Sequence, residues 1–284
     1  MTRIIFTLCA FLSFLWPNWG SAIGDSPVVQ GLGGAGRAGV PSEAIFTNPA
    51  AVGLLTTSGS FIYYTKPTIA EWNAGGRGYA IGAYDGQNES VRGSFAVVRS
   101  SRAIIGRSGT QSYEDRSDYR FALGRSLWAS VIGGLQVRYV TRRAGADEVK
   151  FFDGDIGAIF PVYAGLVGGV VYENALNKPG ERPTTAAAGL MYGLGYGIQA
   201  FADGYRAMKG PEKGQRGWAI GAEMTLAGDF KLRGGRFQDG YRRLKGWSGG
   251  ITWAGPRASF DYAMRTTGDS PRERDHIFGM TVAF

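Results

Sequence analysis

The most reactive pattern in the chain is Gly246-Trp-Ser-Gly-Gly250, which fits the Gly-x-Ser-x-Gly motif of a nucleophilic serine. Asp261 and His276 follow it in the chain order of α/β-hydrolases, so the pattern would correspond to ester hydrolysis. Such a serine needs a strand, a sharp turn and a helix, whereas residues 251–253 continue a strand. The two-residue alternation of strands also places Ser248 and His276 on opposite faces. We therefore expect that the protein is not an enzyme.

A second pattern is formed by Gly31, Gly33 and Gly36, which fit the Gly-x-Gly-x-x-Gly fingerprint of dinucleotide-binding proteins. The fingerprint requires a strand–helix–strand unit around it, and none follows here. The whole chain holds one histidine and one cysteine, so His276 has no second histidine with which to hold a metal ion. The sequence predicts neither a cofactor nor a metal site.

Charged and amide side chains recur on one face of the predicted strands, in alternation with aliphatic and aromatic residues on the other. If the strands close into a barrel, the polar and glycine-rich face is the lumen. Opposite charges there could pair with one another and hold an inserted segment, or they could line a polar permeation path; both interpretations stay open. The lumen-facing candidates are Arg120, Gln136, Arg138, Asp153, Asp155, Glu223, Lys231, Arg233 and Asp261.

The composition indicates which elements position these side chains. Glycine supplies 46 of the 284 residues, about twice the usual share, and glycine disfavours helix interiors. Aromatic residues at 13% argue against disorder. Period-two alternation, as in residues 218–226 and 135–139, predicts about 14 strands. Their expected cores are 58–65, 77–84, 91–99, 115–124, 129–141, 150–160, 164–172, 184–192, 196–202, 217–226, 230–235, 247–253, 258–264 and 276–284.

The connections between these strands alternate in length along the chain. Short ones are predicted at 125–128, 161–162, 193–195, 227–229 and 254–257. Longer ones are predicted at 66–76, 100–114, 142–149, 173–183, 203–216, 236–246 and 265–275. Tight turns at one end and long loops at the other are typical of outer-membrane barrels. The predicted fold is therefore all-β, a transmembrane antiparallel up-and-down β-barrel over residues 55–284.

The N-terminus indicates export. Arg3, an apolar run over residues 4–16 and small residues before Ala22 predict a secretory signal peptide over residues 1–22. Beyond Ala22 no stretch of 18 apolar residues could form a transmembrane helix. We expect the mature chain to lie in the bacterial outer membrane.

The segment before the first strand carries a family resemblance. Its glycine-rich stretch 31–39, followed by Asn48-Pro49-Ala50, resembles the FadL-type outer-membrane transporter superfamily, and residues 153–161 and 171–180 are similar to later stretches of it. That superfamily includes fatty-acid importers, aromatic-hydrocarbon importers of the TodX kind and the PorV-like barrels of secretion systems. The resemblance implies fourteen strands and an N-terminal hatch that folds into the lumen, here residues 23–54. The hatch residues would be Gly31, Gly33, Gly36, Asn48, Pro49 and Ala50.

The resemblance implies uptake of small hydrophobic solutes across the outer membrane. We expect this uptake to be passive, because nothing in the sequence resembles an energy-coupling motif. The alternative is a PorV-like barrel that transports nothing and whose loops bind a partner protein. Nucleic-acid binding is not expected in this compartment.

The formal charge of +8 is concentrated in the predicted outer loops. These side chains could simply be solvated, or they could contact outer-membrane lipid and the anionic headgroups of lipopolysaccharide. The cations are Arg206, Lys209, Lys213, Arg216, Arg236, Arg242, Arg243, Lys245, Arg272 and Arg274.

Overall fold

The computed structural model describes residues 26–68, 77–105, 111–128, 130–145, 147–176, 183–210, 213–226, 228–240, 244–266 and 274–284. The predicted signal peptide and residues 23–25 of the predicted hatch lie outside the described residues.

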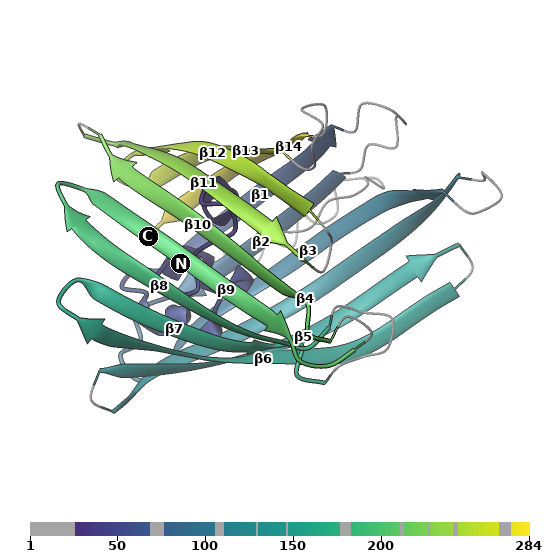
Figure 1. Ribbon diagram of the computed structural model, residues 1–284, viewed down its shortest axis with the longest axis horizontal. Helices are drawn as coiled ribbons and strands as arrows, with labels where there is room; N and C mark the ends of the chain where they lie inside the picture. The colour runs from purple at the N-terminus through teal and green to yellow at the C-terminus, as the bar shows by residue number, and fades with distance from the viewer. Residues whose placement is uncertain are drawn as a thin grey trace.

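The described strands form one closed barrel in which every strand pairs antiparallel with its sequence neighbours and β1 pairs with β14 (Figure 1). The all-β, fourteen-stranded up-and-down barrel predicted from the sequence is confirmed. The strands are β1 (Gly59–Thr68), β2 (Arg77–Asp85), β3 (Arg92–Ile105), β4 (Gln111–Trp128), β5 (Val131–Ala144), β6 (Asp147–Tyr163), β7 (Leu166–Glu173), β8 (Thr185–Gly195), β9 (Ile198–Ala207), β10 (Arg216–Thr225), β11 (Phe230–Asp239), β12 (Leu244–Ala254), β13 (Ala258–Thr266) and β14 (Arg274–Ala283).

The two faces of the wall differ as the alternation predicts. On β10, Trp218 and Ile220 are 40% and 49% exposed, whereas Glu223 is 8% exposed. Large apolar side chains lie on the outward face of most strands, and such an apolar outer band is what a barrel presents to lipid.

Several predicted long connections are instead parts of strands. The expected loop 100–114 is largely a hairpin, because β3 continues to Ile105 and β4 begins at Gln111. The expected loop 142–149 shrinks in the same way. The polar residues of these segments suggested loops. A hairpin that extends into water nevertheless keeps the backbone hydrogen bonds between its two strands, whether its side chains are polar or apolar. The prediction that the outer cations lie in loops is wrong for five of them, because Arg206, Arg216, Arg236, Lys245 and Arg274 lie on strands. Arg242, Arg243 and Arg272 lie outside the described residues.

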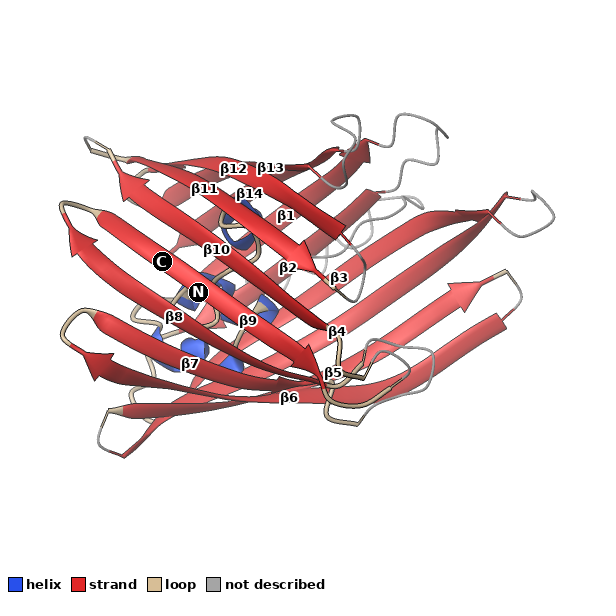
Figure 2. Cartoon of the chain, viewed as in Figure 1, coloured by secondary structure: helices blue, strands red, loops and turns tan. Residues whose placement is uncertain are grey.

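The described chain before β1, from Ser26 onward, forms three short helices that the strands enclose (Figure 2). They are α2 (Pro27–Gly31), η1 (Pro41–Phe46) and η2 (Pro49–Leu54). Each has proline near its start, where the missing N–H costs nothing. The Ser26 hydroxyl and the Asn48 side-chain carbonyl accept the free amides of Val29 and Ala50, at 3.1 and 3.0 Å. None of the helices in the described part of the chain is long or apolar enough to cross a membrane.

Candidate functional site

The N-terminal segment (residues 26–55) packs against the inward face of the wall, and glycine makes that packing possible. Gly124 and Gly134 are register partners on β4 and β5, and Gly134 is in turn the partner of Gly157 on β6. A Cβ atom at Gly134 would lie within 3.0 Å of the backbone of Pro49 and Ala50. The helix η2 can therefore pack this closely against the wall only where the wall residues are glycines.

A second glycine row receives the other half of the segment. Gly221 on β10 and Gly235 on β11 are register partners, and a Cβ atom at either would lie within 3.0 Å of the Leu32 backbone. Gly31 lies beside Gly250, whose Cα would be 3.5 Å from a Cβ at Gly31. Gly31 and Gly33, two of the three predicted hatch glycines, thus lie against inward glycines of the wall.

Arg37 ties the segment to the wall by charge. Its guanidinium forms ion pairs with Glu173 at 2.8 Å and with Asp203 at 3.2 Å, on β7 and β9. The same Asp203 oxygen accepts the backbone amides of Gly36 and Arg37 at 2.9 and 3.0 Å. One carboxylate therefore holds both the side chain and the backbone of this turn.

Asn48 ties the segment to itself and to the wall by hydrogen bonds. Its amide nitrogen donates to the carbonyl of Arg37 at 2.9 Å and to those of Ala158 and Val170 at 3.3 Å. The residue is fully buried, so each of these bonds replaces one that water would otherwise supply. Asn48 thus connects the Arg37 turn, η2 and the strands β6 and β7.

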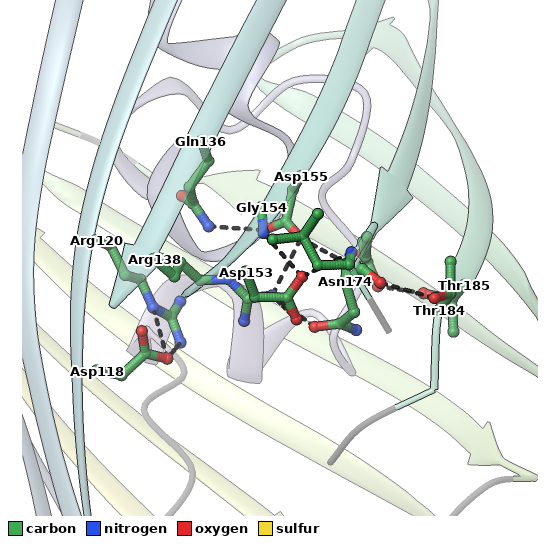
Figure 3. A network of polar contacts seen from close by, with 12 residues as sticks. Asp118, Arg120, Gln136, Arg138, Asp153, Gly154, Asp155, Asn174, Thr184 and Thr185 are labelled. Atoms are coloured by element: carbon green, nitrogen blue, oxygen red, sulfur yellow. Dashed lines mark hydrogen bonds and ion pairs between the residues drawn. The ribbon is translucent and has the colours of Figure 1, made fainter. Parts of the chain in front are cut away.

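Five of the predicted lumen-facing residues gather on β4–β6 in one polar network (Figure 3). Arg138 Nη2 lies 3.2 Å from Asp155, 3.4 Å from Asp153 and 2.5 Å from the Asn174 side-chain oxygen. Gln136 donates to the other oxygen of Asp155 at 2.8 Å. The charges of this network are buried and compensate one another.

Arg120 extends this network to the N-terminal segment. It pairs with Asp118 at 3.1 Å, donates to the Ile45 carbonyl at 3.2 Å and lies over the Phe46 ring, 5.3 Å from its centroid. The wall therefore contacts η1 through a cation, whereas it contacts η2 through glycine.

The remaining predicted lumen residues gather on β10–β13 in a second network. Arg233 pairs with Glu223 at 2.6 Å and lies 3.6 Å from Asp261, and Thr252 bridges Arg233 and Asp261 by hydrogen bonds. Lys231 pairs with Glu223 at 3.1 Å but is 38% exposed, the most accessible of the set. All nine predicted lumen-facing residues thus point inward, in two groups of mixed sign.

Glu43 is a buried carboxyl on the N-terminal segment. One of its oxygens accepts the Tyr63 hydroxyl at 2.9 Å, and the other has no hydrogen-bond partner. Burial raises the pKa of Glu43 to about 7, because the charged form loses its hydration.

A cavity of about 210 Å³ lies between the N-terminal segment and the wall. The segment contributes apolar side chains such as Val29 and Phe46, and the wall contributes charged ones such as Arg138 and Asp155. The cavity can therefore hold a small solute in contact with both kinds of surface.

The two rejected chemical patterns take structural roles. Ser248 faces inward and donates to the Gly31 carbonyl at 3.1 Å, whereas His276 is on the other face and contacts the Tyr262 hydroxyl at 2.8 Å. Gly33 and Gly36 have positive φ angles of 74° and 154°, in a turn rather than a strand–helix junction. Within the described ranges, no group of three or more histidine, cysteine, aspartate or glutamate side chains could hold a metal ion.

Sequence reasoning missed Arg37, Glu173 and Asp203 as a group. Glu173 and Asp203 lie 136 and 166 residues after Arg37 in the chain, so only the closed barrel brings the three together. Asn174 lies in the stretch 171–180 that resembles the superfamily. It directly follows β7 and has a positive φ angle of 54°, which asparagine tolerates.

Comparisons with known proteins place this architecture. No model of a protein family matches the sequence. No curated protein matches it either. Among solved structures, the CymD monoaromatic hydrocarbon channel is similar with a TM-score of 0.78 and 12% identity, over 93% of this chain and 99% of that one.

Two further solved structures are similar to this chain in the same way. The P. putida toluene transporter TodX has a TM-score of 0.72 and 11% identity, over 92% of this chain and 99% of that one. A Pseudomonas aeruginosa FadL homologue has a TM-score of 0.69 and 10% identity, over 94% of this chain and 99% of that one. At these identities the likeness is one of fold, and it extends over nearly the whole of each chain. The chain therefore has the fold of the FadL-type outer-membrane transporters.

Proposed function

We propose that the protein is a passive channel of the bacterial outer membrane that takes up small hydrophobic solutes. The fold supports this proposal, since similar structures are described as a monoaromatic hydrocarbon channel and a toluene transporter. The apolar outward face supports placement in a membrane. The comparisons lend no support to the alternative of a secretion partner.

The observation that carries the proposal is the contact between the N-terminal segment and the two glycine rows, beside the cavity. In this proposal residues 23–54 act as the hatch, and Gly31, Gly33, Gly36, Asn48, Pro49 and Ala50 fit it to the wall. A solute would occupy the cavity and cross when the segment moves.

Solute flux tests the function directly. The purified mature protein is placed in liposomes with no energy source, and entry of a monoaromatic hydrocarbon such as toluene is followed with time. We expect the concentration inside to reach that outside faster than in protein-free liposomes. Equal rates with and without protein would refute the uptake proposal.

Ionic conductance tests the hatch separately. A variant that lacks the mature residues up to Val52 should show a higher leak conductance in planar bilayers than the full-length protein. Unchanged conductance would refute the hatch while leaving the flux result intact.

A further inference from the structure

The outward face of β9–β12 carries positive charge at one end and no negative charge. Arg206 on β9 and Arg216 on β10 are register partners, and both are exposed on this face. Like charges directly opposite on neighbouring strands destabilise a sheet. Neither arginine forms an ion pair with a described residue. An anion bound between them would turn this repulsion into attraction.

The acidic residues of these four strands all point the other way. Asp203, Glu223 and Asp239 have inward positions, where they pair with Arg37, with Arg233 and with the Tyr205 hydroxyl. The outward positions hold only neutral residues and cations. Arg236 on β11 adds a third positive charge, two register positions from the pair formed by Trp218 and Gln238. The charge of this face is therefore arranged for an anionic partner outside the barrel.

Another part of the wall, separated from β9 by β7 and β8, shows a balanced arrangement at the corresponding strand ends. On β5 and β6, Arg143 lies opposite Glu148 in the register, and Lys150 pairs with Glu148 at 3.2 Å. A water-exposed rim therefore does not require unbalanced cations. The strand ends of β5 and β6 do not share the imbalance of β9–β12.

A strip without large side chains leads away from the arginine pair toward the middle of the wall. It runs along β9 and then crosses β10, β11 and β12 at one register position. A Cβ atom at Gly234 would meet nothing within 4 Å, and one at Gly249 would meet only backbone at 3.7 Å. Trp218 and Ile220 border the strip with large exposed side chains. The strip consists of Gly204, Ala202, Ala200, Ala222, Gly234 and Gly249.

We propose that this face binds lipopolysaccharide, with a lipid A phosphate between Arg206 and Arg216 and an acyl chain along the small-residue strip. Guanidinium groups recognise phosphate by paired charge-assisted hydrogen bonds. The arginines lie at the strand ends opposite the short turns, where the outer leaflet of the membrane would be. The inference rests on the outer-membrane placement proposed above and is independent of transport.

The test measures binding of purified lipid A to the full mature barrel by native mass spectrometry. We expect wild-type protein to retain one diphosphorylated lipid A, and R206Q/R216Q to bind it at least about tenfold more weakly, since a charge-assisted contact is worth about that factor. R143Q/K150Q removes the same charge from β5 and β6 and should bind as wild type does. Heat-modifiable migration on a gel shows that each variant is folded.

Three results would overturn the proposal. They are no retention of lipid A by wild type, equal affinity of wild type and R206Q/R216Q, or equally strong binding of phosphatidylglycerol, which would indicate a general anionic surface. Toluene flux is measured on the same samples. Loss of lipid A binding with normal flux, or the reverse, separates failure of this inference from failure of the channel proposal.

Discussion

Substitution of Gly134 by alanine tests whether the wall glycines admit the N-terminal segment. The new Cβ atom would lie within 3.0 Å of the backbone of Pro49 and Ala50. Carbon atoms in contact lie about 3.5–4.0 Å apart, so η2 would have to move away by at least roughly 0.5–1 Å. Overpacking of this kind costs about 1–3 kcal/mol. The undocked population of the segment should therefore rise roughly five- to 150-fold.

Two assays follow this change. Planar-bilayer conductance reports opening, and the labelling rate of a cysteine introduced by A51C reports exposure of η2, since Ala51 is fully buried. The control is Gly234→Ala, a strand glycine that faces outward and whose Cβ would meet nothing within 4 Å. We expect both readouts to rise for G134A and to stay at the wild-type level for G234A. If the two variants behave alike in both assays, the close-packing argument is wrong.

Three further predictions concern the contacts that hold the segment. Arg37→Ala removes the cation that pairs with Glu173 and Asp203. Breaking a fully buried pair costs about 3–5 kcal/mol, and the cost here is smaller because the Arg37 and Glu173 side chains are partly accessible. Conductance should therefore rise, and wild-type conductance would refute the role of these ion pairs in holding the segment. Asn48→Ala removes a helix cap and three donated bonds, at a cost of about 1–3 kcal/mol, which faster labelling of A51C should reveal. Burial raises the pKa of Glu43 from 4.5 to about 7, so the docked segment favours the protonated carboxyl. Docking should therefore be strongest below pH 4.5 and weaken as the pH rises through 7. The E43Q variant should make conductance independent of pH over that range. A flat wild-type profile would contradict this.

The sequence predicts the wall far better than it predicts the contacts inside it. Period-two alternation is sufficient to predict the strands because every strand separates lipid from lumen. The polarity of each residue therefore indicates the face on which it lies. It fails at the rim, where both faces meet water and polar residues continue the β3–β4 hairpin. It also fails for Arg37, whose partners on β7 and β9 depend on barrel closure and on register. Facing inward can be predicted from local sequence, whereas the choice of partner depends on the whole fold.

The polar wall and the N-terminal segment depend on each other energetically. Asp203 accepts two amides of the segment, and Arg120 donates to its Ile45 carbonyl. If the segment leaves, these groups lose hydrogen bonds while still inside the barrel, and a buried group without a partner is costly. Water must then enter to solvate them. Movement of the segment and hydration of the lumen should therefore occur together, which explains why ionic conductance can report the hatch of a channel whose proposed solutes are hydrophobic.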